Sequence, residues 1–184
     1  EPANLAFLVH RVRAEKAAGK DAQEALKMLR FTLDRMGMGG IRDHLGGGFH
    51  RYSVDRFWRI PHFEKMLYDN GQLASIYAEA FQLTGDENYH QILREMLDFV
   101  IREMTDEEGG FYSALDAESE DVEGKFYRWE KEEVEKLLSK EEFRIFSAVY
   151  GLDGSPNFEK EYYAPQLSRS MQELAEEQGI KLAE

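Results

Sequence analysis

The order of connections between helical segments most constrains the fold of this sequence. Apolar residues recur every three or four positions through most of the chain, which is the spacing of one face of an α-helix. Short turns follow the first and third helical segments, at Gly19 and Gly85. Long loops follow the second and fourth, at residues 39–61 and 105–129. This alternation predicts helical hairpins whose long loops share one face.

Capping residues indicate where several of these helices begin. Asp21 with Glu24 predicts the start of the second helix, and Asp86 predicts the start of the fourth. Ser139 with Glu142 predicts the start of a later one. That later helix carries residues 143–149, and two further helices are expected at residues 134–138 and 171–175.

The two long loops resemble each other. Gly47-Gly48-Phe49-His50 in the first loop parallels Gly109-Gly110-Phe111-Tyr112 in the second. Self-similarity of this kind is typical of repeat architectures, here with a helical hairpin as the unit. We therefore expect an all-α fold that forms part of a ring of hairpins, a partial α/α toroid. Functional residues should gather on the long-loop face, where a rigid scaffold presents them.

Composition excludes several classes of protein. The 36 acidic residues outnumber the 23 basic ones and give a net charge of −13, so neither nucleic acid nor an anionic membrane surface is an expected partner. No apolar run approaches the roughly 20 residues that span a bilayer. The sequence has no cysteine, which excludes disulfides, thiolate metal sites and a cysteine nucleophile within it. We expect a cytoplasmic protein.

Aromatic rings and hydrogen-bonding side chains are interleaved in both long loops, as a sugar-like ligand requires. We assign candidate catalytic roles to five residues, namely His50, His62, Glu64, Asp69 and Asp116. Candidate substrate-binding roles fall to nine more, namely His44, Arg51, Tyr52, Trp58, Lys65, Tyr68, Asn70, Tyr112 and Glu118.

The segment after Pro61 suggests how some of these residues converge. If Pro61 lies in the first turn of the third helix, His62, Lys65 and Asp69 share one side of that helix. A base, a cation and an acid would then point into one space. The alternative is that these residues lock the long loop onto the helix ends through hydrogen bonds and ion pairs.

The residues leave two reactions open. Glu64 or Asp69 could pair with Asp116 or Glu118 for glycoside hydrolysis, depending on the separation of the carboxylates. Histidines could act as acid and base in sugar epimerisation, since imidazole titrates near neutrality.

No cofactor is expected. A metal site built from His44, His50 and His62 is disfavoured because their spacing matches no known ligand pattern. The run Gly46-Gly47-Gly48 lacks the lysine and the βαβ setting of a phosphate-binding loop.

Several longer motifs resemble one family. The string from Gly39 to Ser53, Trp58 and the run from Pro61 to Asn70 resemble the spermatogenesis-associated, thioredoxin-domain-containing family. The resemblance continues through residues 109–114 with 116–117, residues 124–127 with Trp129, and residues 154–159. Members join a thioredoxin-like domain to an α/α toroid similar to N-acylglucosamine 2-epimerases and six-hairpin glycosidases. The resemblance implies that residues 1–184 are part of that toroid, without the thioredoxin-like domain and the later hairpins.

Two functions follow as expectations. The first is an enzyme-like toroid domain that binds or acts on a carbohydrate or related polyol. The second is a non-catalytic module that binds a ligand or a protein and is fused to a redox domain. An enzyme should gather at least two titratable groups with shifted pKa values in one concave pocket, whereas in a scaffold such groups should be scattered and paired.

The ends of the chain suggest self-association. The sequence starts at Glu1 without an initiator methionine and enters a helix almost at once, so we interpret it as part of something longer. An open arc of hairpins would expose an apolar edge, and exposed apolar edges tend to find partners. The residues expected at these edges are Leu5, Leu8, Val9, Met171 and Leu174. We also expect Trp58, Tyr68 and Trp129 to be largely buried, and Gly46 to Gly48 to lie close to other backbone.

Overall fold

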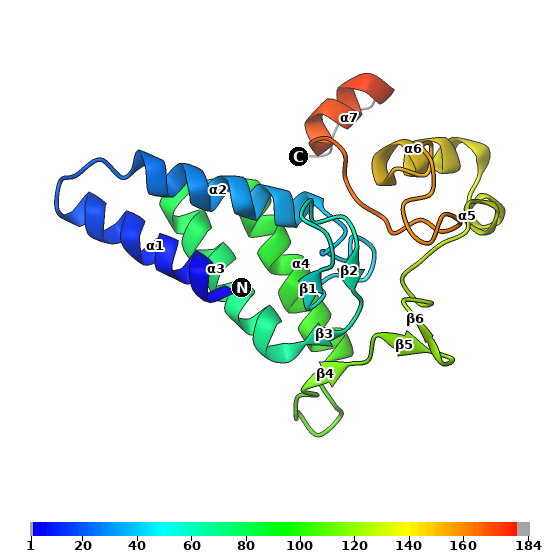
Figure 1. The fold of residues 1–184 in the computed structure, drawn as a ribbon, viewed down its shortest axis with the longest axis horizontal. Coiled ribbons are helices and arrows are strands. Elements are labelled where there is room, and N and C mark those ends of the chain that lie inside the picture. The colour runs from blue at the N-terminus through cyan, green and yellow to red at the C-terminus, as the bar shows by residue number, and fades with distance from the viewer. Residues whose placement is uncertain (1, 180–184) are drawn as a thin grey trace.

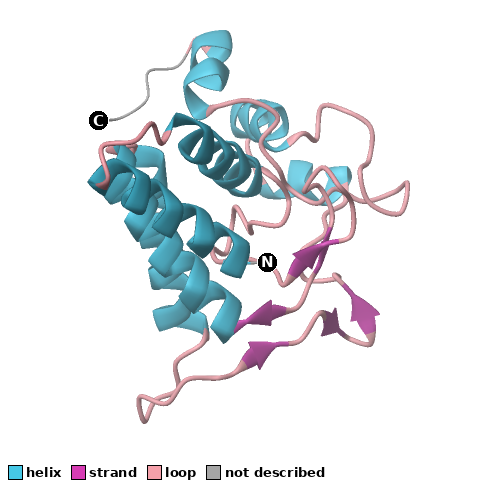
Figure 2. Ribbon diagram, turned by 60° about the vertical axis from the view of Figure 1, so that its left-hand side comes forward, coloured by secondary structure: helices cyan, strands magenta, loops and turns pink. Residues whose placement is uncertain are grey.

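A computed structural model describes residues 2–179 of the chain, which are predominantly helical with small pairs of strands (Figures 1 and 2). The helices of this described part are α1 (Pro2–Ala17), α2 (Gln23–Met38), α3 (Leu67–Thr84), α4 (Glu87–Glu103), α5 (Lys131–Leu137), α6 (Lys140–Tyr150) and α7 (Met171–Gln178). The strands are β1 (Tyr52–Ser53), β2 (Pro61–His62), β3 (Lys65–Met66), β4 (Ala114–Leu115), β5 (Glu118–Ser119) and β6 (Val122–Glu123).

Helices α1 to α4 form two hairpins that pack side by side, with α1 against both α2 and α3 (Figure 1). The two short turns lie at the same end of these helices, where Lys16 of α1 donates to the Leu83 carbonyl near the end of α3. The strands gather at the opposite end, with the long loops (Figure 2). The expected arrangement of short and long connections is confirmed.

The main core fills the space between α1, α2, α3 and α4. Its centre is Tyr77, which is fully buried and stacks on Phe49 of the first long loop with ring centroids 5.6 Å apart. The Tyr77 hydroxyl donates to the Leu33 carbonyl at 3.0 Å, so this buried polar group is satisfied. Since Phe49 is part of this core, it anchors the first long loop to the helices.

Two of the three predicted helix starts are confirmed. The Asp86 carboxylate accepts from the backbone of Asn88 at the start of α4. Ser139 and Glu142 form a reciprocal capping box at the start of α6. The prediction for Asp21 was wrong, because α2 begins after Ala22 and the Asp21 carboxylate accepts from the N–H of Gln23 instead.

The predicted start of the third helix was also wrong. Pro61 lies in β2, and α3 begins only at Leu67. Residues 61–66 stay extended because their two strands are paired: β2 with the nearby β1, and β3 with the distant β4 of the second long loop. The placement of His62, Lys65 and Asp69 on one side of a helix therefore fails, and the expectation of an all-α fold misses these strand pairs.

The two long loops repeat one structure around an aspartate. Asp43 Oδ1 accepts from the N–H groups of Leu45 and Gly46, and Asp106 Oδ1 accepts from those of Glu108 and Gly110. Each turn is closed by an antiparallel bridge, Arg42 to Phe49 in the first loop and Thr105 to Phe111 in the second.

A glycine in the left-handed region allows each of these turns, with φ at +82° for Gly47 and +85° for Gly109. A Cβ atom on Gly47 would lie 2.9 Å from the Glu95 carbonyl oxygen. The expected close approach to other backbone is thus found at Gly47, whereas Gly48 packs against the Phe99 ring and Gly46 against the Asp43 carboxylate.

The apolar residues expected at open edges are mostly covered within the chain. Leu5 and Val9 are buried in the main core, Leu174 is buried and Leu8 is partly buried. Met171 is exposed. Self-association remains a prediction, but these buried residues do not supply its surface. None of the described helices is long and apolar enough to cross a membrane.

Candidate functional site

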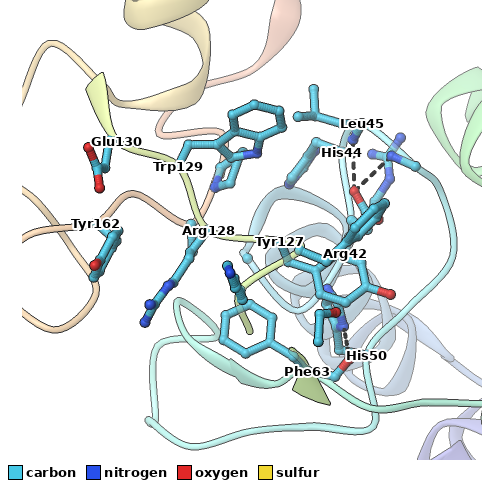
Figure 3. Close-up of a pocket in the computed structure, with 18 of the residues that line it drawn as sticks. Arg42, His44, Leu45, His50, Phe63, Tyr127, Arg128, Trp129, Glu130 and Tyr162 are labelled. Atoms are coloured by element: carbon cyan, nitrogen blue, oxygen red, sulfur yellow. Dashed lines mark hydrogen bonds between the residues drawn. The ribbon is translucent and has the colours of Figure 1, made fainter. Parts of the chain in front are cut away.

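Two cavities open among the loops at the strand end of the helices, each with one of the two tryptophans in its wall. The Trp58 cavity, of about 820 Å³, lies between α1, α3 and the first long loop. The Trp129 cavity, of about 640 Å³, lies between the first long loop and residues 119–133 and 162–165 (Figure 3).

Six of the fourteen candidate residues line the Trp58 cavity. They are His50, Arg51, Tyr52, Trp58, Tyr68 and Asp69. Trp58 is partly buried as part of the wall, but Tyr68 is half exposed, so the expectation that Tyr68 would be largely buried was wrong. Gln72, Thr32 and Asn4 add further polar groups to the same wall.

Asp69 supplies an acid to this cavity. It lies in the first turn of α3, where the N-terminal end of the helix favours negative charge. The residue is buried, and burial raises the pKa of its carboxyl above the ordinary value, against the opposing charge of Arg51. A carboxyl with a raised pKa can donate a proton to a ligand closer to neutral pH.

His50 forms part of the wall of both cavities. Its Nδ1 lies 2.9 Å from the Phe63 carbonyl oxygen and donates to it, and its ring packs edge-on against Phe63 and Tyr127. Burial lowers the pKa of His50 to about 3, with the Lys65 ammonium adding to the effect. His50 is therefore neutral at pH 7, and its Nε2 carries the lone pair.

Arg51, Glu64 and His62 are each paired with another side chain. Arg51 donates to Glu64 at 2.7 Å, and His62 Nδ1 lies 2.7 Å from Glu123 Oε1. The His62 ring stacks on Tyr52 across the β1–β2 pair, with centroids 5.1 Å apart. Neither His62 nor Glu64 lines either cavity. These three contacts hold β1 and β2 together and join β2 to β6.

Lys65 and Asn70 lie beneath the first long loop. The Lys65 ammonium donates to Asp43 Oδ2 at 2.7 Å and to the Gly47 carbonyl at 2.8 Å. Burial alone would raise the pKa of Asp43, but the Lys65 charge outweighs it and holds that pKa below its ordinary value. The Asn70 side-chain amide accepts a hydrogen bond from the Phe49 N–H and donates one to the Phe49 C=O. Both side chains are thus occupied with the loop.

The candidates of the second loop lie at the same end but outside the cavities. Asp116 Oδ1 accepts from the N–H of Glu118 and closes a tight turn, and Tyr112 is half exposed. Asp116 directly follows β4, which pairs with β3. Both long loops therefore meet at one end of the helices, as the sequence predicted for His50 and Asp116.

The Trp129 cavity contains residues that were not candidates. Figure 3 shows Tyr127, Arg128 and Tyr162 around it, with His44 and His50 on the side of the first loop. Trp129 is partly buried and its backbone pairs with Tyr163. The signal for this site was the run of aromatic and basic residues at 125–129, which follows the second loop directly.

His44 is the remaining candidate and lines the Trp129 cavity. Its Nε2 lies 3.0 Å from the Gly39 carbonyl oxygen, to which it donates. Burial of the ring, together with the charge of Arg42, lowers the pKa of His44 to about 4. Two histidines with lowered pKa values, His44 and His50, therefore meet in one cavity.

Comparison with known proteins gives a consistent set of relatives, although no family model matches the chain. Spermatogenesis-associated protein 20 of Homo sapiens is 50% identical over 125 residues, which is 65% of this chain and 16% of that protein. The protein of the same name from Rattus norvegicus is 47% identical over 72% of this chain and 17% of its own length. An uncharacterized protein of Caenorhabditis elegans is 42% identical over 73% of this chain and 20% of its own length.

The chain thus spans 16–20% of the length of these curated relatives. The identity is nonetheless high and extends over most of the chain. Over most of its own length, the chain is thus similar to one part of the proteins named spermatogenesis-associated protein 20.

Proposed function

We propose that this chain is part of an α/α toroid that binds a carbohydrate or related polyol in the Trp58 cavity and transfers protons on it, as a sugar epimerase or isomerase does. Two adjacent helical hairpins with their long loops at one end support the toroid. The observation that carries the ligand class is the composition of the cavity wall. Tyr52, Trp58 and Tyr68 offer rings to the apolar faces of a sugar, beside polar groups that can bind hydroxyls.

The same wall favours proton transfer over hydrolysis. Glycoside hydrolysis uses two carboxyl groups on either side of the scissile bond. Asp69 is the one carboxylate among the described residues that line this cavity. His50 lines the same wall, and its fixed Nδ1–H leaves the Nε2 lone pair as a hydrogen-bond acceptor. The Asp69 carboxyl, whose pKa burial raises, is the group of this wall that takes up and returns a proton in this proposal, and the neutral His50 imidazole serves as a hydrogen-bonding group.

The second candidate is a binding module without catalysis. Its support is the pairing of Arg51 with Glu64, His62 with Glu123 and Lys65 with Asp43. A scaffold would use its charges in this way. The two functions share the ligand and differ only in whether Asp69 acts on it.

The experiment combines a binding screen with a test for exchange. Melting of the full chain is followed with hexoses, N-acetylhexosamines, sugar phosphates and inositol, and carbon-bound protons of each stabilising ligand are followed by NMR in D2O. We expect one class to raise Tm and to exchange a proton, and we expect Asp69→Asn to remove the exchange. Asp98→Asn, an exposed carboxylate of α4 outside both cavities, is the matched control.

Binding without exchange would support the binding module. If no sugar or polyol raises Tm and the emission of Trp58 is unchanged by all of them, the carbohydrate proposal is wrong.

A further inference from the structure

The Trp129 cavity has an unusually aromatic wall. Five aromatic rings line it, and they come from three separate parts of the chain: Phe63, Phe126, Tyr127, Trp129 and Tyr162. Phe63 and Tyr127 stack in parallel, and Phe126 meets Tyr127 edge-on at 5.1 Å. Phe126 is 72% exposed, so the ring of this lining residue is accessible to a ligand from solvent. The apolar part of a ligand can pack against these rings.

The charges that line the cavity do not balance. Each lining cation has a carboxylate partner: Arg42 pairs with Glu95, Lys125 with Glu120 and Arg128 with Glu159. Among the lining carboxylates, Asp43 is paired with Lys65.

Glu130 and Glu133 are different, because no ion pair or hydrogen bond joins either carboxylate to another side chain within residues 2–179. Glu130 precedes α5 without making a side-chain capping bond. His44 and His50 are neutral at pH 7. The wall therefore keeps two uncompensated negative charges, which disfavours a phosphate or carboxylate ligand.

Aromatic rings of this wall already bind cations of the protein itself. The Arg128 guanidinium lies 3.8 Å from the centroid of Tyr162, and the Lys65 ammonium lies 4.9 Å from that of Tyr127. Both distances are within the range of cation–π attraction. The rings of Trp129 and Phe126 carry no such cation among the described residues.

We infer that the Trp129 cavity is a second ligand site, for a small organic cation with an ammonium group on an apolar body. Trp129 and Phe126 receive the apolar surface and the positive charge, and Glu130 and Glu133 neutralise that charge. The site is separate from the one proposed for a polyol, with His50 as the one residue that lines both cavities.

The test compares choline with 3,3-dimethylbutan-1-ol, its neutral isostere, because the two differ in charge and hardly in shape. Binding to the full chain is measured by calorimetry and by the emission of Trp129 in the Trp58→Phe variant. We expect choline to bind at least about tenfold more tightly than the isostere, as a cation–π site with nearby carboxylates requires. Equal binding of the two, or no binding of choline, overturns the inference.

Variants test the assigned residues. Phe126→Ala should abolish choline binding without loss of folding, since that ring is exposed. Glu130→Gln and Glu133→Gln should each weaken it roughly two- to tenfold. Glu135→Gln, an exposed carboxylate of α5 that does not line the cavity, should change nothing. Choline binding that is unaffected by Phe126→Ala and both glutamine variants places the cation elsewhere and overturns the site. Sugar binding at Trp58 is scored separately, so either proposal can fail alone.

Discussion

The Lys65 ammonium lies 2.7 Å from Oδ2 of Asp43, and this ion pair joins β3 to the first long loop. Lys65 is almost completely buried, and it also donates to the Gly47 carbonyl. Asp43 in turn holds the N–H groups of Leu45 and Gly46. The glycine turn that borders the Trp129 cavity is therefore set by one buried ion pair.

Removing either partner of this pair should destabilise the chain strongly. Lys65→Met and Asp43→Asn each leave one buried charge without its partner, which costs about 3–5 kcal/mol. The double variant removes both charges and should cost less than the sum of the two. Urea denaturation of the four proteins gives the coupling energy. Additive losses would show that the two charges do not interact in the folded chain.

Replacing Gly47 and Gly109 by alanine should separate the cost of the left-handed backbone from the cost of a steric clash. Gly47 and Gly109 have nearly the same φ, +82° and +85°, but a Cβ atom on Gly109 meets nothing within 4 Å. Gly109→Ala should therefore cost only the left-handed conformation, about 1–2 kcal/mol. Gly47→Ala should cost about 1–3 kcal/mol more, because its Cβ meets the Glu95 carbonyl. Equal losses in thermal or urea unfolding would contradict the close approach.

The Asn70 amide should be needed for folding more than for binding. It is fully buried and makes three hydrogen bonds to the backbone of Phe49 and Met66, at 2.8, 3.0 and 2.9 Å. Asn70→Ala leaves these backbone groups unsatisfied and should cost about 3 kcal/mol of unfolding free energy. Asn88→Ala at the exposed start of α4 serves as the control and should cost far less. A change below about 1 kcal/mol at Asn70 would contradict its role.

Stability should fall as the pH drops below 6.5. Burial lowers the pKa of His50 from 6.5 to about 3, so the unfolded chain binds a proton that the folded chain excludes. The stabilisation is fully present above pH 6.5 and is lost progressively toward pH 3. Between pH 7 and pH 5 it amounts to about 2 kcal/mol for His50, and the lowered pKa of His44 contributes a similar amount. Unfolding at the two pH values measures this loss.

A histidine variant isolates the contribution of His50 from that of the carboxylates. The pH 7 to pH 5 difference should shrink by about 2 kcal/mol in His50→Gln. It should stay unchanged in His10→Gln, an exposed position of α1. An imidazole resonance of folded His50 that titrates near 6.5 would refute the assignment directly.

The hairpins could be predicted from the sequence because their signals are local. The capping residues Asp86 and Ser139 act within one helical turn, and the glycines of the two long loops reveal the repeat. Residues 61–66 were misassigned because their conformation depends on strand partners outside the segment, one of them far along the chain. Lys65 pairs with Leu115, and no pattern within the segment indicates that partner.

The candidate site could be predicted only where its residues lie close together in the sequence. The six candidate residues of the Trp58 cavity lie within residues 50–69, so their density in the sequence indicated a site, whereas the α1 and α2 residues of its wall gave no such signal. The Trp129 cavity is assembled from three stretches, and the contribution of Tyr162 follows only from the bridge between Trp129 and Tyr163. Lys65 and Asn70 are of residue types that often bind ligands, but the structure places both beneath the first long loop, where they bond its backbone.

The position of His50 between the two cavities has a thermodynamic consequence. Any occupant that shifts this ring, or polarises it, alters the wall that the other occupant meets. Linkage then makes the effect reciprocal: the factor by which a polyol changes the affinity for a cation equals the factor by which the cation changes the affinity for the polyol. If both proposed ligands bind, this one imidazole ring is the structural link through which each would change the affinity for the other.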